Sequence, residues 1–399
     1  MSFENPSQII QSWGLTKNFA AGPTTVDKLV PPTYGKIRTP FVQTWREESL
    51  GTALDWGNSS PFSYYLPESL RVISSMFLQI KCPAIAGGGN NFKPYPGIYA
   101  VRAIRLLSAG QEVYTCDMQA FLRDYCESLS DEELESFGRI YLGHKGASAT
   151  ACTFLIPIPL PNSGYLQRHG HNTRGSGVWP CFTAQNRLEI QIQMNDAGFV
   201  SVGEADPPSI AGACSMLMHQ VDMAAADVLR YSDLRGVYSL INRRFTELTS
   251  GWQTIGANNL VKFNQHQPVG CVTEILVCAV ATGVDEAQRE VLAQVLPSKI
   301  KVIADSVTQK DLNTPEKVQM ELYSNGFTQN SVFKNAGRLC FASHCAESTH
   351  HYSGGYNMQT ASTVSFEFEF AEGVDYRIYA VQLQRVSIDS LGLIRASLE

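Results

Sequence analysis

Two groups of histidine and cysteine residues are the parts of this sequence best suited to chemistry. The first is the pair His169 and His171, which one glycine separates in "QRHGHNTRGSG". Two histidines at this spacing on one strand face hold a metal ion in cupin sheets, where a glutamate follows shortly after the pair. No carboxylate follows here, and the surrounding residues are polar and rich in glycine. The sequence therefore favours a polar loop over a metal centre at this position.

The second group lies in "CFASHCAESTHHYSGG" and contains donors of the types that zinc prefers. These donors are Cys340, His344, Cys345, His350 and His351. Their spacing matches no common zinc knuckle or finger, and Cys340 ends a strand-like run. We expect no bound metal here, although a metal-dependent jelly-roll enzyme or sugar-binding protein remains the alternative interpretation. A stoichiometric metal that is lost on mutation of His169 or His171 would favour that alternative.

Other catalytic signatures are missing from the sequence. It has neither a G-x-S-x-G nucleophile elbow nor a GxxxxGK[ST] phosphate loop. The glycines Gly87, Gly88 and Gly89 follow Pro83 instead of a strand-to-helix junction, which indicates a loop. The carboxylates of Glu367 and Glu369 alternate with phenylalanines, so they belong to the polar face of a strand. We therefore predict a protein without catalytic residues, metal ligands or cofactors, and not an enzyme.

Composition narrows the class of protein. A length of 399 residues suggests two domains. A net charge of −6 argues against a protein that coats nucleic acid through a basic surface. None of the ten cysteines forms a C-x-x-C pair, and several lie in apolar runs as small buried side chains. Without a signal-peptide pattern or an apolar run approaching 18 residues, assembly in a reducing cytosol or nucleus is the simplest expectation.

Alternation of apolar and polar residues dominates the chain and predicts strands. In "RLEIQIQM" the apolar positions are Leu188, Ile190, Ile192 and Met194. "TVSFEFEF" repeats this pattern, and the stretch 61–85 contains a long half-buried strand that ends at a proline. Further strands are predicted in "ATACTFLIPIPL", "SMLMHQVDM", "CVTEILVCAVA", "SKIKVIAD" and "DYRIYAVQLQRVSI".

Helices are predicted only between strands. Asp117 is placed to cap one helix, and Ser130 with Glu133 forms a capping box for a second. A third helical piece fits residues 224–242. Since no β-α-β rhythm appears, the pattern predicts an all-β protein of antiparallel sandwiches or barrels.

Domain organisation follows from the order of these elements. We predict an N-terminal arm over residues 1–38, a first β-domain over 39–223, a helical linker over 224–240 and a second β-domain over 241–399. The two halves follow the same plan of sheet strands, long connections and a closing alternating strand, without a residue-level repeat.

Taken in order, several motifs resemble the double jelly-roll major capsid proteins of large eukaryotic DNA viruses, tailless icosahedral phages and the adenovirus lineage. "YYLPESLRVISSMFLQIKCP" resembles the family's early strand, and Gly110 with Gln111 matches its Gly-Gln turn. "FLIPIPLP", "GVWPCFTAQNRLEIQIQM" and "FNQHQPVGCVTEILVCA" are similar to its middle segments. "SGGYNMQTASTVSFEFEF" with "YRIYAVQLQRVSIDSLGLI" resembles its final strands. The matching residues near the end are Gly354, Asn357, Ala380 and Gly392.

The resemblance implies two tandem eight-stranded antiparallel jelly rolls with a few loop helices. It also implies a virion structural protein, made in the host cytoplasm, whose homotrimers form pseudo-hexameric capsomers of an icosahedral capsid. The implied partners are other copies of the chain, penton and minor capsid proteins, and an internal membrane reached by the N-terminal arm. Sequence-specific nucleic-acid binding is not implied. A minor vertex protein is the other capsid role considered, and two complete rolls in one chain favour the hexagonal tile.

Overall fold

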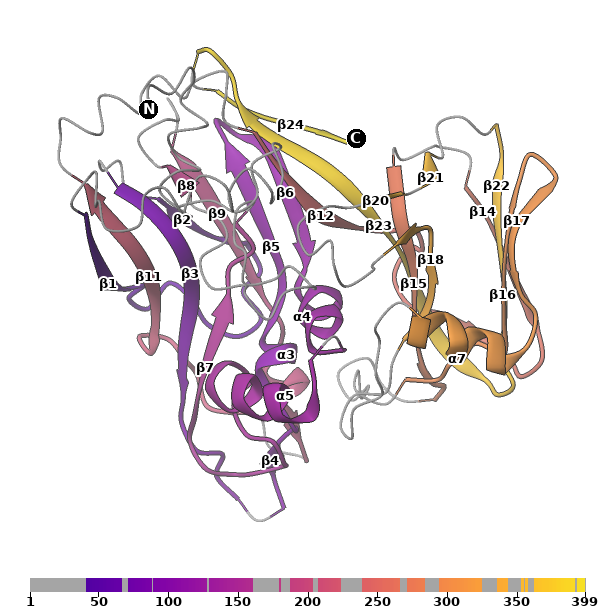
Figure 1. The fold of residues 1–399 in the computed structure, drawn as a ribbon. Coiled ribbons are helices and arrows are strands. Elements are labelled where there is room, and N and C mark those ends of the chain that lie inside the picture. Colours follow the sequence, from indigo (N-terminus) through magenta and orange to yellow (C-terminus); the bar gives the residue numbers. More distant parts are fainter. Residues whose placement is uncertain are drawn as a thin grey trace. The chain divides into compact units, whose positions relative to one another are not determined.

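The structure is a computed structural model, and Figure 1 shows its fold. It describes residues 41–66, 71–87, 89–127, 129–160, 179–180, 187–203, 207–223, 239–265, 271–283, 294–324, 336–343, 353–354, 356–357, 362–391 and 393–398. The predicted N-terminal arm therefore lies outside the described residues, as does the predicted linker except for its last two residues. Within the described part, no helix is long and apolar enough to cross a membrane.

Contacts divide the chain into two compact units that exchange segments. Unit 1 contains Met1–Gln119, Glu135–Asn242 and Arg385–Ser397, and unit 2 contains Ala120–Leu134, Arg243–Gln384 and Leu398–Glu399. A short segment from the first half of the sequence thus belongs to the second unit. The domain ranges predicted from sequence are continuous and contain no exchanged segment. Those ranges stay a prediction.

Unit 1 is built mainly from two antiparallel sheets. The first has the order β1-β11-β3-β7, and its strands are β1 (Phe41–Ser49), β11 (Cys214–Met223), β3 (Arg71–Cys82) and β7 (Cys152–Pro157), with β8 (Trp179–Pro180) paired to β3. The second has the order β2-β9-β5-β6, and its strands are β2 (Phe62–Tyr65), β9 (Leu188–Met194), β5 (Val101–Ser108) and β6 (Gln111–Asp117). A small ladder joins β4 (Asn91–Phe92) to β10 (Ser201–Val202).

Unit 2 repeats this construction. One sheet has the order β12-β23-β15-β18, from β12 (Ser239–Glu247), β23 (Val374–Ile388), β15 (Cys271–Ala281) and β18 (Gly337–Cys340). Shorter additions to it are β13 (Gln253–Ile255) and β21 (Tyr356–Asn357). The strand β24 (Ile394–Leu398) also pairs with β23, although all of its residues except Leu398 are assigned to unit 1. The other sheet has the order β14-β22-β16-β17, from β14 (Leu260–Gln265), β22 (Val364–Glu369), β16 (Lys299–Ala304) and β17 (Val307–Leu312). The strands β19 (Ala342–Ser343) and β20 (Ser353–Gly354) form a separate small ladder.

The two units share one topology. Each unit has eight strands in its two main sheets, and we number these eight from 1 to 8 in chain order. In both units the order of strands is then 1-8-3-6 in one sheet and 2-7-4-5 in the other. Two facing four-stranded sheets of eight antiparallel strands are the arrangement of a jelly roll. The prediction of an all-β chain with two tandem jelly rolls is therefore confirmed.

The cores lie between the paired sheets, as the alternation predicts. Leu188, Ile190, Ile192 and Met194 are buried, and the polar residues between them are half-buried. In unit 2 one apolar cluster joins both sheets, with Ile275 of β15 packed in the same core as Phe366 of β22. Period-two patterning therefore fixes which face of each strand enters the core.

In the described part of the chain the helices lie between strands. They are α3 (Gly97–Ala100), α4 (Met118–Glu127), α5 (Asp131–Phe137), the π-helix η2 (Gly138–Leu142), the 3₁₀-helix η4 (Ala197–Phe199) and α7 (Pro315–Ser324). Asp117 caps α4, because its carboxylate accepts a hydrogen bond from the Gln119 N–H at 3.0 Å. The capping box also forms, with the Ser130 N–H donating to Glu133 and the Glu133 N–H donating to the Ser130 hydroxyl.

One helix prediction is wrong at its end. Residues 239–242, placed in a helical piece by their sequence, begin strand β12, which pairs with the long strand β23. Tertiary pairing overrides local preference here, because β23 is the neighbouring strand with which β12 forms backbone hydrogen bonds. The rest of that piece, residues 224–238, lies outside the described residues.

Candidate functional site

Most of the predicted metal donors lie outside the described residues. This applies to His169 and His171, and to His344, Cys345, His350 and His351. Among the described residues, no group of three or more histidine, cysteine, aspartate or glutamate side chains could hold a metal ion. Cys340 is the one member of either cluster whose surroundings the structure describes.

Charged groups at the end of β18 hold the backbone of Cys340. Its N–H donates to Glu321 of helix α7 at 3.0 Å, and its carbonyl accepts a hydrogen bond from the Lys310 ammonium of β17 at 2.7 Å. Lys310 also forms a close ion pair with Glu321. The Cys340 side chain is buried beside Leu322. These contacts fasten α7 to the end of β18, which is a structural role.

The other candidates from the sequence occupy polar surface and loop positions. Glu367 and Glu369 lie on the polar face of β22, as predicted, and pair with Lys262 at 3.5 Å and Lys299 at 3.4 Å on the neighbouring strands. The loop glycines Gly87 and Gly89 have φ values of +101° and +89°. Backbone of this hand suits glycine and occurs here in a loop after β3.

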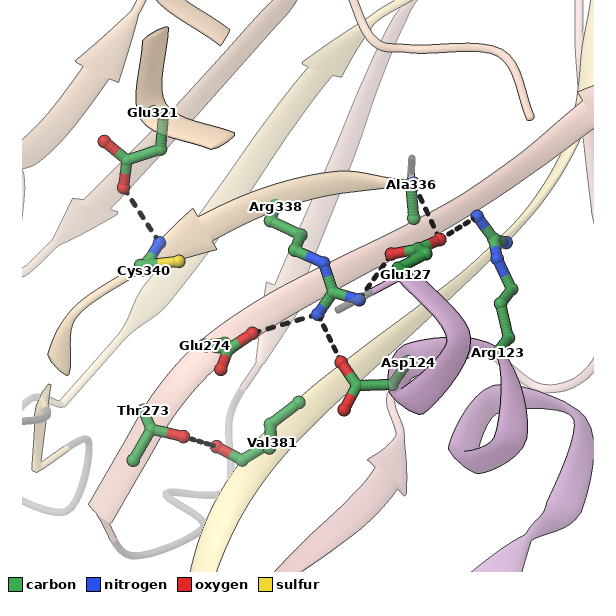
Figure 2. A network of polar contacts seen from close by, with 10 residues as sticks. All are labelled: Arg123, Asp124, Glu127, Thr273, Glu274, Glu321, Ala336, Arg338, Cys340 and Val381. Carbon is green, nitrogen blue, oxygen red and sulfur yellow. Dashed lines mark hydrogen bonds and ion pairs between the residues drawn. The ribbon is translucent and has the colours of Figure 1, made fainter. Parts of the chain in front are cut away.

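The most concentrated chemistry in the described residues is a buried ion network in unit 2, shown in Figure 2. Its centre is Arg338 on β18, whose side chain is fully buried. The guanidinium contacts Asp124 at 2.7 Å, Glu127 at 2.6 Å and Glu274 at 3.0 Å. We call Arg338, Asp124, Glu127, Glu274 and Arg123 the Arg338 network.

Helix α4 supplies three of the five members. Asp124 and Glu127 are three residues apart, so they project from one face of the helix toward Arg338 (Figure 2). Arg123 forms a close ion pair with Glu127 one turn away, and both side chains are buried. The Glu127 oxygen that pairs with Arg123, Oε1, also accepts the Ala336 N–H at 3.0 Å, and the other oxygen, Oε2, faces Arg338. The helix is thereby joined to both the side chain and the backbone at the start of β18.

Electrostatics keeps Arg338 charged. Burial opposes the charge on Arg338, but the carboxylates of Asp124, Glu127 and Glu274 outweigh it and raise the pKa of the guanidinium above its ordinary value. A guanidinium held in this way does not exchange protons near neutral pH. Because the network is also closed to solvent, its geometry fixes helix α4 on the sheet of unit 2 and offers no acid, base or nucleophile to a substrate.

Comparison with known proteins identifies the architecture. No protein-family model matches the chain, and no curated protein matches its sequence. Among solved structures, the PBCV-1 virus capsid is similar with a TM-score of 0.65 at 12% identity, covering 91% of this chain and 98% of that chain. The Faustovirus major capsid protein gives 0.61 at 10% identity, covering 92% and 94%. The mavirus major capsid protein gives 0.54 at 10% identity, covering 89% and 90%.

The chain has a double jelly-roll fold. At these identities the similarity establishes the shared fold, and it agrees with the identical strand order of the two units. The resemblance seen in the sequence motifs is thereby confirmed at the level of structure.

Several large apolar side chains of the described residues are exposed and could make contacts with a partner. In unit 1 the Trp45 side chain on β1 is 54% exposed and packs against His219, with ring centroids 4.6 Å apart and the rings tilted by 32°. In unit 2 Met320 and Tyr323 are 69% and 79% exposed, one turn apart on α7. Large apolar side chains on a surface are typical of places where proteins associate.

Sequence reasoning did not find the Arg338 network, although the chain contains signals for it. Glu274 is the only charged residue in the apolar strand "CVTEILVCAVA", and Arg338 lies in "GRLC", where every residue is buried. A lone charge in an otherwise apolar strand requires a buried partner. Helix α7 was also missed, although Thr314 followed by Pro315 is a common helix start and the Thr314 hydroxyl accepts the Lys317 N–H.

Proposed function

We propose that the chain is a viral major capsid protein, a structural subunit without catalytic activity. The observation that carries this proposal is the presence of two complete jelly rolls of the same strand order, in a fold shared over nearly the full length of capsid proteins. A jelly roll is a rigid wall element, because its strands bury a continuous core and its loops are confined to the ends.

Self-association follows from the doubled fold. Three copies of a chain with two similar rolls supply six similar walls around a three-fold axis. Such a trimer has a pseudo-hexagonal outline that can tile the face of an icosahedral shell. Permanent interfaces of this kind are broad and partly apolar, which fits a chain with 44% apolar residues and only 17% charged residues.

Further partners and the location belong to the same proposal. Assembled trimers would contact penton and minor capsid proteins, and the chain would reside in the virion after synthesis in the host cytoplasm. Residues 1–38 would reach under the capsomer toward a neighbour or an internal membrane. Normal capsid assembly after deletion of residues 1–20 would refute that role for the arm.

The alternative of a metal-dependent or sugar-binding jelly-roll protein has no support from the described residues. Those residues contain no group of three or more side chains that could hold a metal ion, and the similar structures reported above are capsids or major capsid proteins. Metal analysis of purified protein tests this alternative directly, because it requires a stoichiometric metal that depends on His169 or His171.

Negative-stain imaging of the purified, tag-free chain tests the capsid proposal. We expect three-fold particles with a six-lobed outline and a mass near three times 43.9 kDa. A variant with lysine at both Met320 and Tyr323 tests one candidate contact surface in the same assay. Compact monomers or two-fold dimers of the wild-type chain at micromolar concentration would overturn the proposal.

A further inference from the structure

Three cysteines of unit 1 gather at one end of the sheet β1-β11-β3-β7. Cys82 ends β3, Cys152 begins β7 and Cys214 begins β11. The register places Cys82 directly opposite Cys152 on neighbouring antiparallel strands. Cys214 lies opposite Ile80, one diagonal step from Cys82. All three thiols are free in the structure.

The Cα spacing expected for the Cys82–Cys152 pair is within reach of a disulfide, and closure must draw the Cβ atoms together from about 5.5 Å to about 3.8 Å by a shift of the strand ends. The Ile158 N–H donates to the Met76 carbonyl at 2.8 Å, and alternation along the ladder makes Cys82 and Cys152 a hydrogen-bonded pair as well. The Cα atoms of such a pair lie about 5.5 Å apart, inside the range of about 4.4–6.8 Å that disulfides span. Both side chains project to the same face of the sheet, because alternation places them with Ile80 and Phe154.

We propose that Cys82 and Cys152 form a latent disulfide that closes when the protein meets an oxidising small-molecule disulfide such as oxidised glutathione. Cys152 is the half-buried member, whereas Cys82 is 2% exposed. The Cys152 thiolate attacks the oxidant and releases one glutathione thiolate. The Cys82 thiolate then attacks the Cys152 sulfur and releases the second. One S–S bond forms in the protein, one breaks in the oxidant, and the two thiol protons pass to the glutathione thiolates.

Slow closure is expected in the folded chain. Burial, aided by the nearby thiols of Cys152 and Cys214, raises the pKa of Cys82 to about 12. Burial also raises the pKa of Cys152 to about 12. Only the thiolate reacts, so the rate should rise about tenfold for each pH unit between 7 and 9. The pair therefore tolerates brief exposure to oxidant and closes on long exposure.

The consequence for the particle rests on the proposed function. A subunit assembled in a reducing compartment keeps both thiols, and a released particle enters surroundings that favour disulfides. Closure would then join β7 covalently to β3. The new bond between residues 82 and 152 would close the segment between them into a loop. The chemistry itself can be tested on purified protein, whether or not the chain forms capsomers.

Peptide mapping after oxidation tests the proposal. The folded full-length chain is incubated with oxidised glutathione at pH 8.5, free thiols are alkylated, and the protein is digested with trypsin without reduction. We expect a disulfide between peptides 82–102 and 146–168 that disappears on treatment with dithiothreitol. We also expect the oxidised chain to melt about 5 °C higher, because the bridge closes a long loop.

Two variants sharpen the result. Cys152→Ser should lose the linked peptides and the melting shift, whereas Cys214→Ser should keep both, since the Cys214 thiol donates to the Ile210 carbonyl at 3.6 Å and faces Ile80. Full alkylation of Cys82 and Cys152 in the wild-type chain after a day of oxidation would overturn the proposal. A bridge from Cys82 to Cys214 would overturn it as well. The wild-type map decides the question even if a variant fails to fold.

Discussion

Replacement of Arg338 by methionine should destabilise unit 2 more than any change of a surface arginine. Each of the three contacts of Arg338, at 2.6–3.0 Å, corresponds to about 6 kcal/mol of attraction at an effective dielectric constant of about 20. Desolvation of the guanidinium and the carboxylates offsets most of that sum. Removing one partner of a buried pair has a net cost of about 3–5 kcal/mol, because the remaining charges lose their compensation. We expect a loss of this size for Arg338→Met.

The measurement is urea unfolding followed by far-UV circular dichroism, together with hydrogen exchange of residues 118–127. Exchange in α4 should accelerate, because three of the five members of the Arg338 network lie on that helix. Arg105→Met is the matched control, since Arg105 is exposed on β5 and its loss should change the unfolding free energy by less than about 0.5 kcal/mol.

A double-mutant cycle identifies the cause. Glu274→Gln removes one of the carboxylates that Arg338 neutralises, so the pair of substitutions should cost about 1–3 kcal/mol less than the sum of the single costs. An unfolding free energy of Arg338→Met within 1 kcal/mol of wild type would refute the reasoning. So would strict additivity of the two substitutions, because additivity means that the charges do not interact.

Three further predictions concern other parts of the chain. Lysine at both Met320 and Tyr323 should leave the melting temperature nearly unchanged but weaken self-association at least tenfold in sedimentation experiments, and unchanged association would exclude this face of α7 as a contact. Phe366→Ala should cost about 3–5 kcal/mol in urea unfolding, because its ring is fully buried in the core of unit 2, and a cost below 1 kcal/mol would contradict that packing. A hydrogen bond from the Leu393 N–H lowers the pKa of Asp389 below its ordinary 3.8, so its stabilising effect is complete above pH 3.8 and disappears as the pH falls through the lower folded value. Asp389→Asn should therefore lower the melting temperature more at pH 6 than at pH 2, and an equal decrease at both would show that the carboxylate charge is not the cause.

Local patterns were sufficient to predict most strands and two helix starts. The faces of β9 and β22 follow directly from alternation, because one residue of register would exchange the core face with the solvent face. Asp117 and the Ser130–Glu133 box identify helix starts for an equally local reason, since a cap satisfies backbone groups only two or three residues away. The identical sheet order of the two units could not be derived from local patterns, because strand pairing joins distant segments.

The Arg338 network was beyond prediction for the same physical reason. Glu127 and Arg338 are 211 residues apart in the sequence, and nothing local indicates that they meet. Arg123, Asp124 and Glu127 resemble the solvated face of an amphipathic helix when α4 is considered alone. The helix buries that face because it packs in unit 2, although it follows the strand β6 of unit 1.

The network also explains how a helix can keep one position on a second jelly roll. Apolar contacts such as the edge-to-face pair of Phe121 and Phe245 are weakly directional, so they permit a helix to slide or rotate by a fraction of a turn. A guanidinium between three carboxylates has very few arrangements that satisfy all of its ion pairs. Any shift of α4 would therefore leave a buried charge without its partner. The directional contacts of Arg338 therefore select one register among the many that the apolar surface allows. The proposed role as a shell subunit, which requires one shape to be repeated many times, gives a reason for burying five charged side chains.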